Sequence, residues 1–222
     1  WYSSYVYATL ATDFYGLQED KLSNVNKIFE IKQKVAKFYP NSEELKNINN
    51  LVSKINSQEL SVQAERYINE NQNAPIQLTH KNLSQVFVKI FAYNEGFDGE
   101  NKIQVLNVYN ENRIAEAQKF LNSLKVVDQY TIDVKSFEDY QNHSTIVKLN
   151  PLKSGRYIVL FSNNSEFKIN TKDDIDYLDI MVSKYAINSL NDKLSVVNRE
   201  TGKPESNVAV EFSNLTNYYK ME

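Results

Sequence analysis

The sequence contains no cysteine and is poor in glycine, proline and histidine. The absence of cysteine excludes disulfide bonds, thiolate nucleophiles and cysteine-based metal sites. With 5 glycines in 222 residues, few loops can bring the backbone close to a ligand. No apolar run reaches the ~20 residues of a membrane-spanning helix. The net charge of −3 lacks the basic excess of nucleic-acid-binding proteins, so we expect no nucleic-acid partner and no transmembrane segment in this chain.

Residues 1–72 have the apolar spacing of amphipathic helices. Apolar side chains recur at intervals of three and four residues, which places them on one helix face. Tyr39-Pro40 ends one such run, because proline cannot continue the helical hydrogen-bond ladder. Asn41 can cap the next helix, with Glu44 in a capping-box arrangement. We expect a helical segment over residues 1–72, with helices at 2–14, 22–38, 41–55 and 58–71.

After residue 72 the apolar pattern changes to the alternation that is typical of strands. The stretch from Glu111 to Leu124 keeps helical spacing and is predicted to be a helix inserted among the strands. Short strands separated by Gly, Asn, Asp and Ser clusters indicate an antiparallel β-sandwich over residues 75–186, which makes the fold class α+β. The expected strands are 86–91, 102–109, 130–135, 145–149, 157–162 and 180–185.

The last part of the chain, residues 190–222, follows a polar stretch from Ser189 to Lys193. Apolar residues alternate around Leu194 to Val196 and again from Val208 to Phe212, which predicts two more strands. An isolated hairpin is marginal in water, so these strands either dock on the preceding sheet or open a second, truncated sandwich. We favour the second sandwich.

Between these two strands stands "NRETGKPESNVAV", in which Gly202-Lys203 resembles the end of a phosphate-binding loop. A Walker loop needs a glycine four residues earlier, a Ser or Thr after the lysine, and a helix after that. Here Pro204 follows the lysine, and a strand pattern follows the proline. The stretch is therefore predicted to be a turn between strands, with no nucleotide or other cofactor.

No stretch of the sequence predicts a metal site or a catalytic site. The only histidines, His80 and His143, lie far apart in the chain. Asp173-Asp174 and Asp176 resemble part of a calcium loop but lack its sixth-position glycine and twelfth-position glutamate. No Gly-x-Ser-x-Gly elbow is present either. We expect no catalytic, cofactor-binding or metal-binding residues, and no enzyme activity.

Two other functions stay open at this stage. A carbohydrate-binding or adhesin sandwich would present a row of exposed aromatic side chains, for example Tyr93 and Phe97 near the Gly-Phe-Asp-Gly loop. A small hydrolase with a carboxylate pair would need a deep cleft with two facing carboxyl groups about 5–10 Å apart. Such pairs assemble in space and leave no spacing signature in the sequence.

Three stretches together resemble the Gram-negative bacterial alpha-2-macroglobulin-like family. The first combines Tyr39-Pro40-Asn41-Ser42 and Asn73-Ala74-Pro75-Ile76 with "THKNLSQVFVKIFAYN" from Thr79 to Asn94, in which His80-Lys81-Asn82 matches a step before a strand. The second is "EDYQNHSTIVKLNPLKSGRYIVLFSNN", with an acidic-Tyr pair and a Leu-x-x-Gly-x-Tyr unit. The third is the Thr201-Gly202-Lys203-Pro204 turn. After Pro204 the family has an apolar residue and a small pair, where this chain has Glu205-Ser206-Asn207; Asn207 can adopt the positive φ of such a turn.

The resemblance implies macroglobulin-type sandwich domains in a longer endopeptidase inhibitor of the bacterial cell envelope or periplasm. The chain would be its non-catalytic N-terminal scaffold, with downstream domains as partners and proteases as partners of the whole protein. The sequence begins with Trp1 rather than methionine, so we expect that its N-terminus is trimmed; whether a signal peptide or a lipid anchor belongs to the missing part stays open. The family's thioester cannot lie in this chain, because a thioester needs cysteine.

Overall fold

The computed structural model describes residues 2–17, 19–93, 103–107, 113–169, 175–190 and 193–210. The chain divides into two compact units. The first consists of residues 1–59, 79–84 and 133–143, and the second of residues 60–78, 85–132 and 144–222. We call them the helical unit and the sandwich unit. Each is therefore assembled from segments that lie far apart in the sequence.

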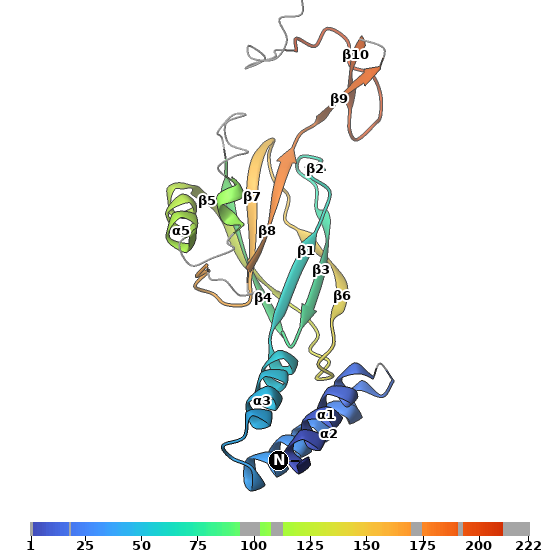
Figure 1. The fold of residues 1–222 in the computed structure, drawn as a ribbon. Helices are drawn as coiled ribbons and strands as arrows, with labels where there is room; N and C mark the ends of the chain where they lie inside the picture. The colour runs from blue at the N-terminus through green and yellow to red at the C-terminus, as the bar shows by residue number, and fades with distance from the viewer. Residues whose placement is uncertain are drawn as a thin grey trace, which may run out of the picture. The chain divides into compact units, whose positions relative to one another are not determined.

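The helical unit contains α1 (Tyr2–Gly16), α2 (Lys21–Phe38) and α3 (Glu43–Asn56), shown in blue and cyan in Figure 1. The prediction that α2 ends before Tyr39-Pro40 is confirmed. Apolar side chains from the three helices form one buried core. Its buried members are Ala11, Val25, Ile28, Ile31, Val35, Ile48, Val52 and Ile55. They recur at helical intervals, which is why this part of the fold can be read from the sequence.

The start of α3 differs by one residue from the prediction. Its N-cap is Ser42 rather than Asn41, and the Ser42 hydroxyl oxygen accepts a hydrogen bond of 3.1 Å from the backbone N–H of Leu45. Glu43 and Glu44 both lie in the first turn, where their negative charges favour the helix dipole. The shorter serine side chain therefore provides the cap.

Loop 134–142, between two strands, also belongs to the helical unit. Tyr140 of this loop packs against the helical core, and its ring meets that of Phe29 on α2 edge to face, with centroids 5.7 Å apart. Glu138 and Tyr140 both have positive φ angles, 54° and 59°. This conformation is unfavourable for residues with a side chain, so the surrounding contacts must stabilise the loop.

The sandwich unit is built from two sheets with strand orders β1-β3-β6 and β2-β8-β7-β4-β5. The backbone N–H of Val62 on β1 donates a 2.8 Å hydrogen bond to the carboxylate of Asp176 on β8, which joins the two sheets at one edge. The bounds are β1 Glu59–Gln63, β2 Tyr67–Ile68, β3 Ala74–Lys81, β4 Gln85–Ala92, β5 Lys125–Asp133, β6 His143–Leu149, β7 Gly155–Ser162 and β8 Ile175–Val182 (Figure 1).

This strand order is that of an immunoglobulin-like sandwich. Strands β1, β3 and β6 correspond to strands A, B and E of that fold, whereas β4, β7 and β8 correspond to C, F and G. The β4–β7 and β7–β8 pairs are antiparallel. The short β2 adds a parallel pair beside β8, so the sheet is mixed at this edge. The predicted α+β fold class is confirmed.

A tyrosine corner supports the same assignment. At the start of β7 the hydroxyl of Tyr157 donates a 2.9 Å hydrogen bond to the carbonyl of Lys153, four residues upstream. Immunoglobulin-like domains carry such a bond at the start of strand F. Gly155 has a φ of 156°, and a Cβ placed there would lie 3.3 Å from the Tyr157 hydroxyl. The Leu-x-x-Gly-x-Tyr unit therefore builds this corner.

One strand of the sandwich unit, β7, is buried on both faces. Tyr157 through Ser162 are all buried. Helix α5 (Ile114–Ser123), with the η1 turn (Gln104–Leu106), packs over one face of this sheet. The cluster there includes Phe91, Ala117, Leu121, Ile158, Leu160 and Phe167. This explains the continuous apolar run of β7, because a strand covered on both faces loses its alternation.

Several predictions about elements differ from the structure, and the strand predicted over 180–185 is divided between the end of β8 and the start of β9. Residues 58–71 form β1 and β2 rather than a helix, and Leu60 and Val62 are buried with period two. Strand β3 was not predicted, although Ala74, Ile76 and Leu78 alternate inward. Residues 104–106 form a short 3₁₀ helix where a strand was predicted over 102–109, of which 102, 108 and 109 lie outside the described residues. Short apolar segments fit both periods, so tertiary pairing decides between them.

The C-terminal hairpin consists of β9 (Tyr185–Leu190) and β10 (Lys193–Asn198), which pair antiparallel. Of the polar stretch 189–193, predicted as a boundary, Ser189 and Leu190 end β9 and Lys193 begins β10, while 191 and 192 lie outside the described residues. The predicted turn at Gly202 is confirmed, because Gly202 has a φ of 68° and its N–H donates to the carbonyl of Asn198. Pro204 forms one bridge with Val197, and Asn207 has the positive φ expected of it.

No strand is present at 208–210, and Phe212 lies outside the described residues, so the strand predicted from Val208 is not formed in the described part. The predicted inserted helix is α5; residues 111 and 112 of its expected range lie outside the described part. The predicted division into residues 1–72, 75–186 and 190–222 stays a prediction.

The tyrosine corner predicts how much the hydroxyl of Tyr157 contributes to the free energy of unfolding. Replacing Tyr157 with Phe leaves the packing but removes the donor to Lys153, so we expect the free energy of unfolding to fall by about 1 kcal/mol. Urea denaturation followed by circular dichroism measures the change. Tyr185→Phe, at a residue that is 42% exposed, is the matched control and should change little. Equal effects of the two substitutions would contradict the assigned role of the corner.

Candidate functional site: the polar cluster around His80, Lys81 and Asn82

A cluster of polar side chains in the helical unit surrounds the end of α3. Lys81, at the end of β3, is only 7% exposed. Its Nζ lies 3.0 Å from the carbonyl oxygen of Lys54, 3.3 Å from the hydroxyl of Ser57 and 2.6 Å from a carboxylate oxygen of Glu59. The last carbonyls of a helix have no partner within the helix. Lys81 therefore satisfies one of them and brings positive charge to the negative end of the helix dipole.

Asn82 completes this arrangement. Its side-chain amide donates hydrogen bonds of 3.0 Å to the carbonyls of Ile55 and Ser57. Asn82 has a φ of 53°, a left-handed conformation that asparagine tolerates better than most residues. Side chains distant in sequence thus cap the C-terminal end of α3, and the glycine cap common at helix ends is absent from this one.

Glu59 is the anion of this cluster. Burial acts to raise the pKa of its carboxyl, but hydrogen bonds from Lys81, Asn142 and Ser57, together with the charge of Lys81, lower it overall. The ionised carboxylate is therefore the form that the cluster binds. The Glu59 side chain is 36% exposed and that of Lys81 is 8% exposed, so the pair is only partly shielded from water.

The two histidines of the chain meet beside this cluster. The ring centroids of His80 and His143 lie 6.3 Å apart. His143 stacks on Phe137 with a centroid distance of 3.8 Å, and its Nε2 lies 2.9 and 3.0 Å from the two carboxylate oxygens of Asp139. His80 is 3% exposed, and its Nδ1 finds no hydrogen-bond partner among the described residues.

Burial and hydrogen bonds affect the titratable groups of the histidine pair in different ways. Burial lowers the pKa of His80, and the nearby His143 lowers it further. Burial acts to raise the pKa of Asp139, but the hydrogen bonds from His143 and from the backbone N–H of Gln141 lower it overall. His80 is therefore held in its neutral form and Asp139 in its ionised form.

Neither cluster has the arrangement of a known catalytic centre. The Asp139 carboxylate orients His143, as in a triad, but the residues around the pair include no described nucleophile within hydrogen-bonding distance of the ring. In the described part of the chain, no group of three His, Asp or Glu side chains is placed to hold a metal ion. The predictions that the chain has no catalytic and no metal-binding residues stay predictions.

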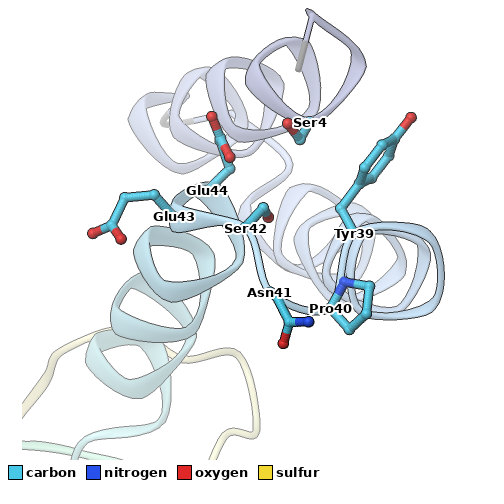
Figure 2. Close-up of a pocket in the computed structure, with 7 residues that line it drawn as sticks. All are labelled: Ser4, Tyr39, Pro40, Asn41, Ser42, Glu43 and Glu44. Carbon is cyan, nitrogen blue, oxygen red and sulfur yellow. The ribbon is translucent and has the colours of Figure 1, made fainter.

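A pocket of about 500 Å³ lies at the N-terminal end of α3 (Figure 2). It is lined by Ser4, Tyr39, Pro40, Asn41, Ser42, Glu43 and Glu44. Its two carboxylates point in different directions, and that of Glu43 binds Lys46 at 2.8 Å on the surface. The hydrolase alternative requires a facing pair, and these two side chains do not form one.

The residues considered for carbohydrate stacking and for a calcium loop are only partly within the described residues. Tyr93 is completely buried, with Phe120 edge-on at 5.8 Å and the guanidinium of Arg156 over its ring at 5.1 Å. It therefore cannot join an exposed carbohydrate-stacking row, and Phe97 lies outside the described residues. Asp173 and Asp174 also lie outside them, while Asp176 accepts the hydrogen bond from Val62.

Sequence reasoning did not find the proximity of His80 and His143. The two residues lie near the ends of β3 and β6, which are neighbours in one sheet. Only the pairing of these strands brings the rings together, and β3 was not predicted. The usable signal was the alternation of Ala74, Ile76, Leu78 and His80, which places His80 on the buried face of a strand.

The strand order and the tyrosine corner define the class of this protein, an immunoglobulin-like β-sandwich scaffold with a helical unit. No protein-family model matches the sequence, and no curated protein matches it. Among the described residues, no helix has the length and apolar character needed to cross a membrane.

Solved structures that are similar in part include two bacterial alpha-2-macroglobulins. A fragment of the Escherichia coli protein spanning domains NIE-MG1 is 16% identical, with 66% of this chain and 73% of that chain covered and a TM-score of 0.35. Salmonella alpha-2-macroglobulin reacted with methylamine is 13% identical, with 65% of this chain and 11% of that chain covered and a TM-score of 0.27. The CARDB domain of a Pyrococcus furiosus protein is 8% identical over 57% of this chain and 88% of that chain, with a TM-score of 0.30. These scores are all below 0.5, so the fold assignment rests on the topology of the chain itself.

Because Lys81 caps α3, its ion pair with Glu59 should contribute more to the free energy of unfolding than the exposed pair of Lys46 and Glu43. Lys81→Met keeps most of the apolar stem but leaves the Lys54 carbonyl and the Glu59 carboxylate without this donor, so we expect a loss of about 2 kcal/mol in the free energy of unfolding. Lys46→Met is the matched control, because Lys46 and Glu43 are 70% and 71% exposed, and its effect on the free energy of unfolding should be much smaller. Chemical denaturation of both variants measures the difference, and similar losses would contradict the capping role.

Asn82 permits a test that separates backbone strain from hydrogen bonding. Asn82→Gly removes the two side-chain hydrogen bonds but accepts the left-handed backbone, whereas Asn82→Ala loses both advantages. We expect the alanine variant to be less stable than the glycine variant by about 1 kcal/mol. Thermal denaturation ranks the wild type and the two variants. A glycine variant no more stable than the alanine variant would show that the φ of Asn82 is not a constraint.

Proposed function

We propose that this chain is a non-catalytic scaffold from the N-terminal part of an alpha-2-macroglobulin-like protein of the bacterial cell envelope. The observation that carries the proposal is that the three motifs behind the sequence resemblance all have structural roles. Lys81 and Asn82 of the first motif cap α3, Leu-x-x-Gly-x-Tyr builds the tyrosine corner, and Thr201-Gly202-Lys203-Pro204 makes a turn. These roles suit a scaffold, whose motifs fix the fold rather than contact a substrate.

The C-terminal hairpin supports the idea that further domains follow in the intact protein. Its register places Tyr185, Ile187, Leu194 and Val196 on one face. Tyr185, Ile187 and Leu194 are 42%, 53% and 49% exposed. A two-stranded hairpin is marginal in water, and apolar residues on one face are typical of the inner side of a sandwich. The proposal is that downstream strands cover this face as a second macroglobulin-type domain.

In this proposal the chain holds later domains in place and performs no chemistry itself. Endopeptidase inhibition belongs to the whole protein, in which cleavage by a protease triggers its entrapment. An extracytoplasmic location, in the periplasm or cell envelope, follows from the same proposal. So does the expectation that neither a nucleic acid nor a cofactor binds to this chain.

A trapping assay on the full-length gene product tests the proposal. Trapped trypsin should lose activity on casein while it still cleaves a small chromogenic peptide, because the cage excludes large substrates only. Residues 1–222 alone should change neither rate, and osmotic shock should release the full-length protein with the periplasmic fraction. A reading frame without further sandwich domains, or inhibition of both substrates alike, would refute the proposal.

A further inference from the structure

The histidine pair lies where loop 134–142 meets the helical unit, and it has no part in the scaffold role proposed above. His80 is buried at the end of β3, and its Nδ1 has no hydrogen-bond partner among the described residues. A proton on this nitrogen would therefore find no acceptor there. The ring centroids of His80 and His143 are only 6.3 Å apart, so water screens the interaction between the two rings poorly. A positive charge on His80 is therefore unfavourable, first because of its burial and second because of the nearby His143.

Among the described residues, three contacts besides this pair join the loop to the rest of the helical unit. Tyr140 packs on Phe29, Asn142 donates a hydrogen bond to Glu59, and the backbone N–H of Val134 donates to the carbonyl of Ser84. Against these contacts stand two residues with side chains at positive φ, Glu138 and Tyr140. The contacts that hold the loop closed are thus opposed by backbone strain.

The charged and titratable groups near the two histidine rings lie in loop 134–142, on β3 and on β1. Asp139 binds His143 from within the loop, and the ammonium group of Lys135 lies 4.7 Å from the centroid of the Phe137 ring on which His143 stacks. On β3 and β1, Lys81 and Glu59 bind each other and so compensate their own charges. No carboxylate in a described contact binds His80 directly.

We propose that protonation of His80 in mildly acidic solution releases loop 134–142 from the helices, so that the loop acts as an acid-sensitive latch. The buried imidazolium of His80 has no carboxylate partner among the described contacts, whereas the opened loop exposes it to water. Asp139 stays ionised throughout this range and continues to bind His143. The latch therefore opens at His80 rather than at the His143–Asp139 pair.

The sign of the effect follows from the lowered pKa of His80. A histidine whose pKa is lowered by folding contributes its full stability above the ordinary value of about 6.5 and loses it as the pH falls below that value. The chain contains only two histidines, and other side chains change charge little in this range. Closure of the loop should therefore weaken between neutral pH and about pH 5.5.

Amide hydrogen exchange of the whole chain tests the latch. After correction for the chemical exchange rate, exchange of the Val134 and Gln141 amides should accelerate about 10-fold between roughly pH 7.5 and pH 5.5. Amides of β7 should not change, since the latch opens locally. His80→Leu should abolish the acceleration, with His80→Phe as the second variant if the first does not fold. His143→Gln should retain it, because the trigger is His80.

Each other outcome overturns the proposal. An acceleration that persists in His80→Leu and disappears in His143→Gln would assign the trigger to His143. Equal acceleration in β7 would show global acid unfolding rather than a latch. No acceleration in the wild type, with His80 shown by imidazole NMR titration to protonate in this range, would show that the charge does not open the loop.

Discussion

The capping of α3 by Lys81 and Asn82 determines how residues 79–84 join the helical unit. The last carbonyls of a helix need hydrogen-bond partners from outside the helix. Here the adjacent side chains of Lys81 and Asn82, at the end of β3, supply them. Because Lys81 is almost buried, it also needs the Glu59 carboxylate beside it. These requirements fix where residues 79–84 lie in the helical unit, and with them the positions of His80 and of its neighbour His143.

A different constraint organises the sandwich unit, namely that β7 is covered on both faces. One face meets the inside of the sandwich, and the other meets α5 and Phe167. The tyrosine corner fixes how the chain enters this strand, since Gly155 leaves room for the Tyr157 ring and hydroxyl. Polar motifs of this chain thus lie at a helix end, at the corner before β7 and at the turn of Gly202.

Much of the fold could be predicted from particular residues. Pro40 marked the end of α2, the spacing of Ile48, Val52 and Ile55 gave α3, and Gly202 gave a turn. The errors fell on short segments. Leu60 and Val62 fit a strand, yet Leu60, Tyr67 and Ile68 also fit helical spacing, so local pattern could not decide. The candidate site could be predicted only in part. Lys81 and Asn82 belong to a sequence motif, but the sequence does not show that they bind the carbonyls at the end of α3.

By itself, the sequence determined the α+β class, the helical periodicity, the turn residues and the absence of cysteine chemistry, because each depends on side chains close together in the chain. Tertiary structure alone decided that His80 meets His143, that Tyr93 is buried and that Lys81 reaches the carbonyl of Lys54. These contacts join residues on different strands and helices. They depend on which strands pair and in what register, and the apolar pattern of one segment carries no information about its partner.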